Sequence, residues 1–400
     1  MSLTKIEKQT TVGDELPLFR LGFRAFFLCA GISAVVLLLA WLYFLNHGGP
    51  YTQYTSIGWH AHEMIFGYAL AVIAGFLLTA AKNWTGVPTL HGHWLGAFVL
   101  LWLAGRVAPW LPLPASLIAV VDLAFLPLLA TALLRPLLKT AQHQHLVFVG
   151  ILLLLFIANL LFHAGNVYPG WQTVDLGIRL GWMTIIFLVT VMGGRVIPFF
   201  IERGTGNIGK IRQSRAIEIG SVASLLAWVV TALISPVAIH VVYLACLAGL
   251  FQLLRWWHWH LGALWRVPML WILYLGYAWI PLGLFLYAYA GLTGGGLSPA
   301  VHAFTAGAIG LLTIGMMARV SLGHTGRDIH ASPTIIVAFI LVSLGSILRV
   351  FGPLLLPVMS GESYMGVIAM AGGLWALGFL LFVIVFIPVW IKPRIDLRPG

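Results

Sequence analysis

The hydrophobic pattern of this 400-residue chain consists of long apolar runs separated by short polar segments. A transmembrane helix needs roughly 20 predominantly apolar residues, and twelve such runs leave no stretch for a soluble domain. The pattern predicts an all-α polytopic membrane protein, with about twelve transmembrane helices in a single domain over residues 1–400. The predicted spans are 22–45, 59–81, 94–110, 115–138, 144–165, 175–200, 216–235, 236–257, 269–291, 298–320, 333–354 and 365–391.

The positions of lysine and arginine support an even number of spans. If the N-terminus is cytoplasmic, 19 of the 22 Lys and Arg fall at the cytoplasmic face and the six opposite loops carry none. The other three, Arg106, Arg179 and Arg349, lie inside spans near the outer face. Cytoplasmic loops of membrane proteins are enriched in Lys and Arg. We therefore predict that both termini are cytoplasmic, and the net charge of +11 needs no nucleic acid to explain it.

The N-terminus and the cysteines limit the processing and the cofactor chemistry. Lys5, Lys8, Asp14 and Glu15 precede the first span without a short apolar core or a cleavage site, so we predict no removable signal peptide. Both cysteines fall within spans, which argues against disulfides and thiolate metal sites. The chain has no Cys-x-x-Cys-His motif, so any haem would be held without covalent attachment.

A weak internal period of 120 residues runs through the chain. Thr-Gly pairs at 85–86, 205–206 and 325–326 each follow an even-numbered span, and His62 and His302 lie 240 residues apart. The period predicts three four-helix repeats, residues 20–140, 141–260 and 261–391. Haem–copper oxidases also arrange twelve helices with pseudo-threefold symmetry. That comparison concerns layout alone, since this sequence lacks their adjacent His-His pair.

Four histidines are predicted at a similar depth near the outer face. His60 and His62 open the second span, His163 closes the fifth and His302 opens the tenth. Ionisable groups in a membrane usually mark functional sites, and histidine is a common metal and haem ligand. Two histidines at i and i+2 point about 200° apart on a helix, so they suit two centres better than one. Alternatively, each histidine satisfies a nearby backbone carbonyl.

Two arginines of the same layer are candidate anchors for haem propionates. Arg106 and Arg349 each lie a few residues below the outer face, and the planar guanidinium suits carboxylates. Alternatively, Arg106 pairs with Asp122 as a structural ion pair and Arg349 extends to the membrane surface.

Glu63 and Tyr68 are the candidate catalytic residues. Glu63 could deliver protons or orient His62, or it could lie at a helix N-terminus because the helix dipole favours a carboxylate there. Tyr68 follows His62 within two turns, and could be redox-active or only packed.

The cytoplasmic face carries a second candidate segment. Arg319 to Arg327 combines glycines, hydroxyls, His324 and two arginines, which could cradle an anion or the propionates of a second haem. It could equally be a tight turn that joins the tenth and eleventh spans. The His-x-His pairs of this face, 91/93, 143/145 and 258/260, are interpreted as interfacial residues.

Several long motifs in one order resemble the NnrS family. They are Trp59-His-Ala-His-Glu-Met-Ile-Phe-Gly-Tyr68, Gly75-Phe-Leu-Leu-Thr-Ala80, Asn83-Trp-Thr-Gly86, Gly193-Gly-Arg-Val-Ile-Pro-Phe199 and Arg319-Val-Ser-Leu-Gly-His-Thr-Gly-Arg327. The resemblance implies a polytopic bacterial inner-membrane protein that carries haem and copper and serves nitric oxide metabolism and resistance to nitrosative stress. The positions that carry over are His60, His62, Glu63, Arg195, Arg319, His324 and Arg327.

From the residues and the resemblance together, we expect a haem protein that binds nitric oxide (NO) and reduces or otherwise detoxifies it. We expect one or more haem b groups near the periplasmic face, with copper as a further metal. His62 and His302 form the first predicted ligand pair, and His60 and His163 serve the second centre. A periplasmic cytochrome or quinol would supply electrons.

Two other functions stay open at this stage. A transporter of metal or iron–nitrosyl complexes would need interrupted helices and a polar path at mid-membrane depth, whereas the ionisable groups here gather near one face. A haem-based NO sensor without catalysis would need the same ligands. The sequence does not decide between a nitric oxide reductase and a protein that only binds NO.

Overall fold

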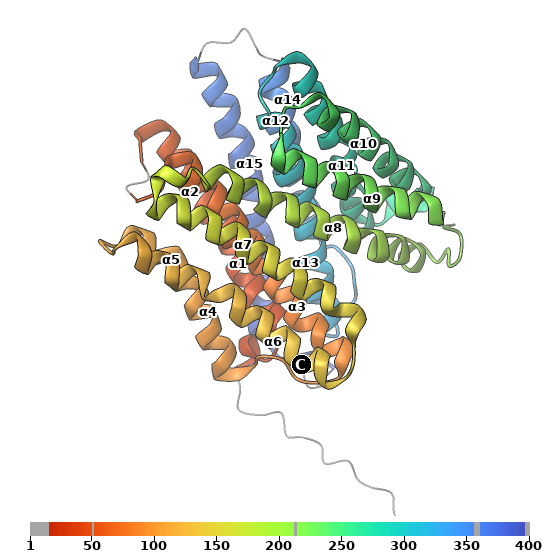
Figure 1. The fold of residues 1–400 in the computed structure, drawn as a ribbon. Helices are drawn as coiled ribbons and strands as arrows, with labels where there is room; N and C mark the ends of the chain where they lie inside the picture. The colour runs from red at the N-terminus through yellow and green to blue at the C-terminus, as the bar shows by residue number, and fades with distance from the viewer. Residues whose placement is uncertain (1–15, 50–51, 212–213, 356–360, 397–400) are drawn as a thin grey trace, which may run out of the picture.

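A computed structural model describes residues 16–49, 52–211, 214–355 and 361–396 (Figure 1). Helices and turns make up these residues, and no strand occurs among them. The segment with Lys5, Lys8, Asp14 and Glu15, which led us to predict no signal peptide, lies outside the described residues.

The protein is a helical membrane protein, as predicted. Eleven helical spans in the described residues are long and apolar enough to cross a membrane. The remaining predicted span corresponds to α4 (Gly92–Val107), whose 16 residues continue into the 3₁₀ turn η3 (Ala108–Trp110). A 16-residue helix is about 24 Å long, less than the roughly 30 Å of the hydrocarbon core. The short helix therefore needs the extra turn to approach the full thickness.

The other spans keep close to their predicted bounds, and three of them are divided into consecutive helical segments. They are α1 (Gly22–His47), α2 (Ser56–His62) with η2 (Glu63–Ala69) and α3 (Leu70–Thr85), α5 (Ala115–Leu123) with α6 (Phe125–Lys139), α7 (Leu146–Val167), α8 (Val174–Thr205), α9 (Arg215–Ile234), α10 (Ile239–His258), α11 (Pro268–Thr293), α12 (Ser298–His302) with η7 (Ala303–Ile309) and α13 (Gly310–His324), α14 (Pro333–Leu355) and α15 (Gly361–Ile391).

The two described chain ends meet at one face of the bundle (Figure 1). The buried guanidinium of Arg24, near the start of α1, donates to the backbone oxygens of Trp390 and Lys392 at 2.9 and 2.8 Å. An even number of crossings brings a chain back to the side from which it started. We use "chain-end face" for this face of the bundle and "opposite face" for the other.

Burial separates central helices from peripheral ones. In the most apolar stretches of Ser56–Thr85, Ser298–His324 and Pro268–Thr293, 89%, 72% and 67% of the residues are buried, against 33% in Arg215–Ile234. Lipid tails are as apolar as the side chains that face them, so hydropathy does not distinguish the two kinds of helix. The most buried span begins with His60 and His62, which places both histidines at the centre of the fold.

Two central spans contain a wide helical turn at matching positions. The π-helical segments η2 and η7 begin directly after His62 and His302. The π-helix is rare and is found most often at functional sites. The two segments therefore indicate a functional site in the part of the bundle that holds His62 and His302.

The three Thr-Gly pairs adopt one conformation at the chain-end face. Each glycine has a positive φ, which a residue without Cβ adopts at no steric cost. Each threonine hydroxyl donates to the carbonyl four residues earlier, with donor–acceptor distances of 2.6, 2.7 and 2.7 Å. The pairs are Thr85-Gly86, Thr205-Gly206 and Thr325-Gly326.

Candidate functional site

A cavity of about 380 Å³ lies among α1, α2, α8, α12, α14 and α15, toward the opposite face. Cofactor sites in proteins are typically mostly apolar cavities of about 300–1,000 Å³ with a few polar groups. We call this space the histidine cavity. Its ionisable and phenolic lining side chains are His60, Tyr68, Asp175, Arg179, His302 and Arg349.

His302 is oriented by its own helix. Its Nδ1 lies 2.8 Å from the backbone oxygen of Ser298, a contact in which the ring nitrogen must donate. The proton on Nδ1 leaves Nε2 with a free lone pair. Metal-binding histidines are commonly held in this tautomer by a backbone carbonyl. The Nε2 lone pair of His302 is therefore available to bind a metal ion.

His60 lines the same cavity with less restraint. Its ring stacks on Trp41, with ring centroids 4.5 Å apart and planes 11° from parallel. Its Nδ1 is buried and has no hydrogen-bond partner among the described residues. Leaving a buried polar atom unpaired is costly. The unpaired Nδ1 therefore indicates that His60 interacts with a bound ligand.

The charges around the histidine cavity favour an anionic group. The cavity lining includes two guanidinium groups, Arg179 on α8 and Arg349 on α14, and one carboxylate, that of the exposed Asp175. Nη2 of Arg349 donates to Ser298 Oγ at 3.0 Å, whereas its Nη1 and the Nε of Arg179 are buried without a partner. Guanidinium groups with free donors bind carboxylates well. The cavity thus combines histidine ligands with a place for carboxylates, the donor set that haem requires.

Tyr68 closes the inner end of this cavity. Its hydroxyl is hydrogen-bonded to Thr313 Oγ1. The threonine hydroxyl has one hydrogen, which it donates to the Ile309 backbone oxygen at 2.6 Å. Tyr68 is therefore the donor in the bond to Thr313, and its phenolic oxygen keeps its lone pairs for the cavity.

A second cluster of polar side chains lies on the other side of α2. His62, Asp122 and His163 are buried, and one ligand atom from each lies within 4.8 Å of the others. Asp122 Oδ2 is 3.2 Å from His62 Nε2 and 3.0 Å from His163 Nε2. Asn159 Nδ2 donates to the same oxygen at 2.7 Å. We call these residues, with Glu63 and Arg106, the aspartate cluster.

Arg106 belongs to the aspartate cluster and does not line the histidine cavity. Its guanidinium donates to Glu63 Oε1 at 2.8 Å and to Asp122 Oδ1. The structural ion pair with Asp122, the alternative to a propionate anchor, is what the structure shows. Glu63 also lies outside the cavity lining, and its Oε1 is 3.1 Å from His62 Nδ1.

The charges of the aspartate cluster do not balance when both histidines are neutral. Two carboxylates, Glu63 and Asp122, face one guanidinium, and all three groups are buried. Both ring nitrogens of His62 face oxygen atoms. The charge balances with a second proton on His62, with a proton on one of the carboxylates, or with a cation bound by Nε2 of both histidines and Asp122 Oδ2. A carboxylate on the far ring nitrogen, as Glu63 provides, is the usual support of a metal-bound histidine.

Tyr54 lies beside the aspartate cluster, with its ring centroid 5.5 Å from that of His62. Burial and the Asp122 carboxylate raise the pKa of the Tyr54 phenol, so it stays neutral. Its hydroxyl is buried without a hydrogen-bond partner among the described residues.

The histidines thus pair differently from the prediction. The structure places His60 with His302 and His62 with His163, whereas we expected His62 with His302 and His60 with His163. His62 and His302 do occupy matching places, each directly before a π-helical segment. Matching positions in the two π-helical spans therefore face different neighbours.

The candidate segment on the chain-end face does not reach either site. The Arg319 guanidinium lies over the Phe200 ring, 3.9 Å from its centroid. The backbone oxygen of His324 accepts from Arg394 at 2.8 Å, so the chain's last described residues pack on this turn. Arg327 Nη1 is buried without a partner among the described residues.

Sequence reasoning missed five contributors to these sites, Asp175 and Tyr54 among them. Arg179 had a detectable signal, because it is the third arginine inside a span near the outer face, beside Arg106 and Arg349. Asn159 and Trp41 gave none, since a single amide or indole in an apolar helix is common. Their roles depend on which helices meet.

The family comparison agrees with the sequence motifs. A family model described as "NnrS protein" matches residues 17–394 of the chain. No curated protein sequence matches the chain. The matched region includes every residue of the histidine cavity and the aspartate cluster.

Proposed function

The chain belongs to the NnrS family, which links this membrane protein to nitric oxide, and from this premise we propose that it holds haem in the histidine cavity and binds and reduces NO there. The observation that carries the proposal is the joint placement of His60, His302 and two arginines with unpaired donors around one cavity. A haem group presents a metal for imidazole nitrogens and two carboxylates for guanidinium groups.

His302 is the better candidate for the permanent ligand. Its Nδ1–H is held by the Ser298 carbonyl, so Nε2 is directed without further adjustment. His60 has no hydrogen bond on its buried Nδ1, and stacking on Trp41 is its main restraint. His60 would therefore be the less firmly held of the two haem ligands. Arg179 and Arg349 would neutralise the propionates.

Reduction of NO needs electrons and protons: two NO, two electrons and two protons give N₂O and water. Haem iron supplies a site where NO binds and a carrier for single electrons. Among the chain's own groups, Asp175 is exposed and lines the cavity, so it can pass protons inward from water. The phenolic oxygen of Tyr68 can accept a hydrogen bond at the inner end. A membrane quinol or a periplasmic cytochrome is the proposed electron donor.

The aspartate cluster is the proposed copper site. Two imidazole nitrogens and a carboxylate oxygen suit copper, and a cation there supplies the missing positive charge. A copper ion there would supply one-electron chemistry, and α2, which lies between this cluster and the histidine cavity, would separate it from NO. Glu63 then orients His62 and does not deliver protons. This arrangement fits a bacterial inner-membrane protein with its haem near the periplasmic face.

A panel of histidine variants tests the proposal. We expect the detergent-purified protein to show haem bands in a reduced-minus-oxidised spectrum, and the reduced bands to shift with NO. His302→Ala should lose haem, and His60→Ala should keep part of it with an altered spectrum. His240→Ala, at an exposed position on α10, is the matched control. Full haem content in both His60→Ala and His302→Ala would refute the assignment.

Metal analysis of the same preparations tests the second centre. We expect His62→Ala and His163→Ala to lose copper and His302→Ala to keep it. NO consumption with an added electron donor then separates a reductase from a protein that only binds NO. Copper that is absent from the native protein, or that survives in both variants, would leave the aspartate cluster as a protonated ion-pair network.

A further inference from the structure

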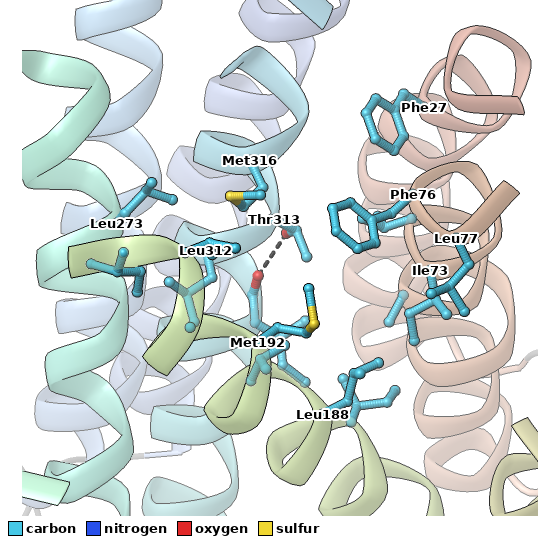
Figure 2. A pocket seen from close by; sticks show the side chains of 18 residues that line it. Phe27, Ile73, Phe76, Leu77, Leu188, Met192, Leu273, Leu312, Thr313 and Met316 are labelled. Carbon is cyan, nitrogen blue, oxygen red and sulfur yellow. Dashed lines mark hydrogen bonds between the residues drawn. The ribbon is translucent and has the colours of Figure 1, made fainter. Parts of the chain in front are cut away.

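A second cavity, of about 100 Å³, lies deeper in the bundle among α1, α3, α8, α11 and α13 (Figure 2). Figure 2 shows Leu188, Met192 and Leu312 from α8 and α13 facing Ile73 and Phe76 of α3 across this space. Its lining is aliphatic, aromatic and thioether, with Thr313 as the one polar side chain among the described lining residues. We call it the apolar cavity.

The apolar cavity offers water at most one polar side-chain partner, the remaining lone pair of Thr313. The Thr313 hydroxyl donates to the Ile309 backbone oxygen and accepts from Tyr68. A water molecule needs two to four polar partners to occupy a cavity, and apolar cavities of about 150 Å³ stay dry and bind xenon. The apolar cavity is therefore suited to a small uncharged molecule.

The two cavities follow one another along three spans that line both of them, Ser56–Thr85, Val174–Thr205 and Ser298–His324. Each span lines the histidine cavity first and the apolar cavity one or two turns later. The boundary residues Ala69, Ile185 and Ile309 line both cavities. The apolar cavity thus continues the histidine cavity toward the chain-end face.

One hydrogen bond crosses this boundary. Tyr68 lines the histidine cavity and Thr313 lines the apolar cavity, so their bond joins η2 to α13 where the two spaces meet. Apart from this bond, the boundary consists of one methyl and two aliphatic side chains. It blocks water and ions more strongly than it blocks a diatomic gas, because only the former must give up hydrogen bonds.

Five side chains that line the apolar cavity are only half-buried. They are Phe76, Val189, Met192, Val196 and Met316. A weakly polar gas dissolves readily in hydrocarbon, so it can arrive from the lipid. We infer that the apolar cavity is a binding site for NO on a path from the bilayer to the histidine cavity. The identity of the gas rests on the proposed function; the site for a small apolar molecule does not.

Xenon is the probe that tests the site without haem. We expect crystals of the native protein under xenon pressure to show a xenon atom among Ile73, Leu188 and Leu312 by anomalous scattering. Ile73→Phe and Leu188→Phe should exclude it, since the added ring occupies the space. Leu154→Phe, at a lipid-facing position 44% exposed on α7, should retain it. Xenon elsewhere in the protein but not here, or an ordered water or lipid acyl chain in this space, would overturn the inference.

The rate of NO binding tests the path. In haem-loaded protein, Ile73→Phe and Leu188→Phe should slow NO association several-fold and leave the haem spectrum unchanged, while Leu154→Phe should match the native rate. Unchanged rates in both filled variants would show that NO enters elsewhere. A protein that binds xenon but no haem would contradict the proposed function and keep the apolar site.

Discussion

Arg106 carries its charge where water hardly reaches it, because it is 8% exposed and its guanidinium lies between Glu63 and Asp122. Exposed ion pairs contribute little to stability, with a median of about 0–1 kcal/mol. Removing one partner of a buried pair costs about 3–5 kcal/mol, because the other charge stays buried and unpaired. The stability of the aspartate cluster therefore depends on keeping all of its charges together.

Arg106→Leu should lower the melting temperature of the detergent-solubilised protein far more than Asp396→Asn. The first change leaves two buried carboxylates without their cation, whereas the second removes the partly exposed partner of Arg394. Adding Glu63→Gln and Asp122→Asn to Arg106→Leu should restore part of the loss, because it removes the unpaired charges. Equal melting temperatures for the two single variants would show that the buried pairs add no net stability.

Glycines set how closely the helices that carry the site approach each other. A Cβ at Gly177 of α8 would lie 2.6 Å from the backbone oxygen of Ala158 and 2.6 Å from the backbone nitrogen of Phe162, both on α7. Membrane helices often associate through small residues that permit such contact. The same part of α7 carries Asn159 and His163 to Asp122. The geometry of the aspartate cluster thus depends on a glycine that does not touch it.

Gly177→Ala should move α7 away from α8. We expect a loss of about 1–3 kcal/mol of stability, as for other over-packed sites, together with a reduced metal content of the aspartate cluster. Gly150→Ala is the control on α7, because a Cβ there meets no atom within 4 Å. Melting temperature and metal content should both stay at native values in the control. Native metal content in Gly177→Ala would mean that the close helix contact does not position His163.

At the scale of the whole molecule, the charges and the contacts between the chain ends point to the same topology. Nineteen of the 22 Lys and Arg lie at one predicted face, and Arg24 bonds to the backbone at Lys392 where the two chain ends meet. The charge distribution and the contact between the chain ends both fit a chain that crosses the membrane an even number of times. The enrichment of positive residues in cytoplasmic loops predicts that the chain-end face is cytoplasmic.

Single cysteines should label from opposite sides. Gly170 and Gly262 are exposed, lie in loops at the two ends of the bundle, and have no neighbour within 4 Å of an added Cβ. With Cys29→Ala and Cys246→Ala as background, a membrane-impermeant maleimide should label Gly170→Cys in spheroplasts, and Gly262→Cys only after lysis. The reverse pattern would invert the proposed orientation. Labelling of both in intact spheroplasts would argue against an odd number of spans between the two loops.

Local chemistry was enough to predict the helices, their approximate bounds and the residues worth examining. A span in a membrane must satisfy its own backbone hydrogen bonds, so a run of apolar residues specifies a helix with no knowledge of its neighbours. The same reasoning singled out His60, His62, His163 and His302, because an ionisable group inside such a run usually marks a functional site. The π-helical segments that follow His62 and His302 were not predicted from the sequence and appear only in the structure.

The sequence by itself thus determined that this chain is a helical membrane protein of about twelve spans with a layer of histidines and charges near one face. Only the tertiary structure decided which of these groups meet. It paired His60 with His302, gave Arg106 to Asp122, and brought Arg179 into the histidine cavity. The physical reason is that lipid and protein interior are equally apolar, so hydropathy does not mark which face of a helix turns inward. That choice depends on glycine contacts, wide helical turns and partners far apart in the chain.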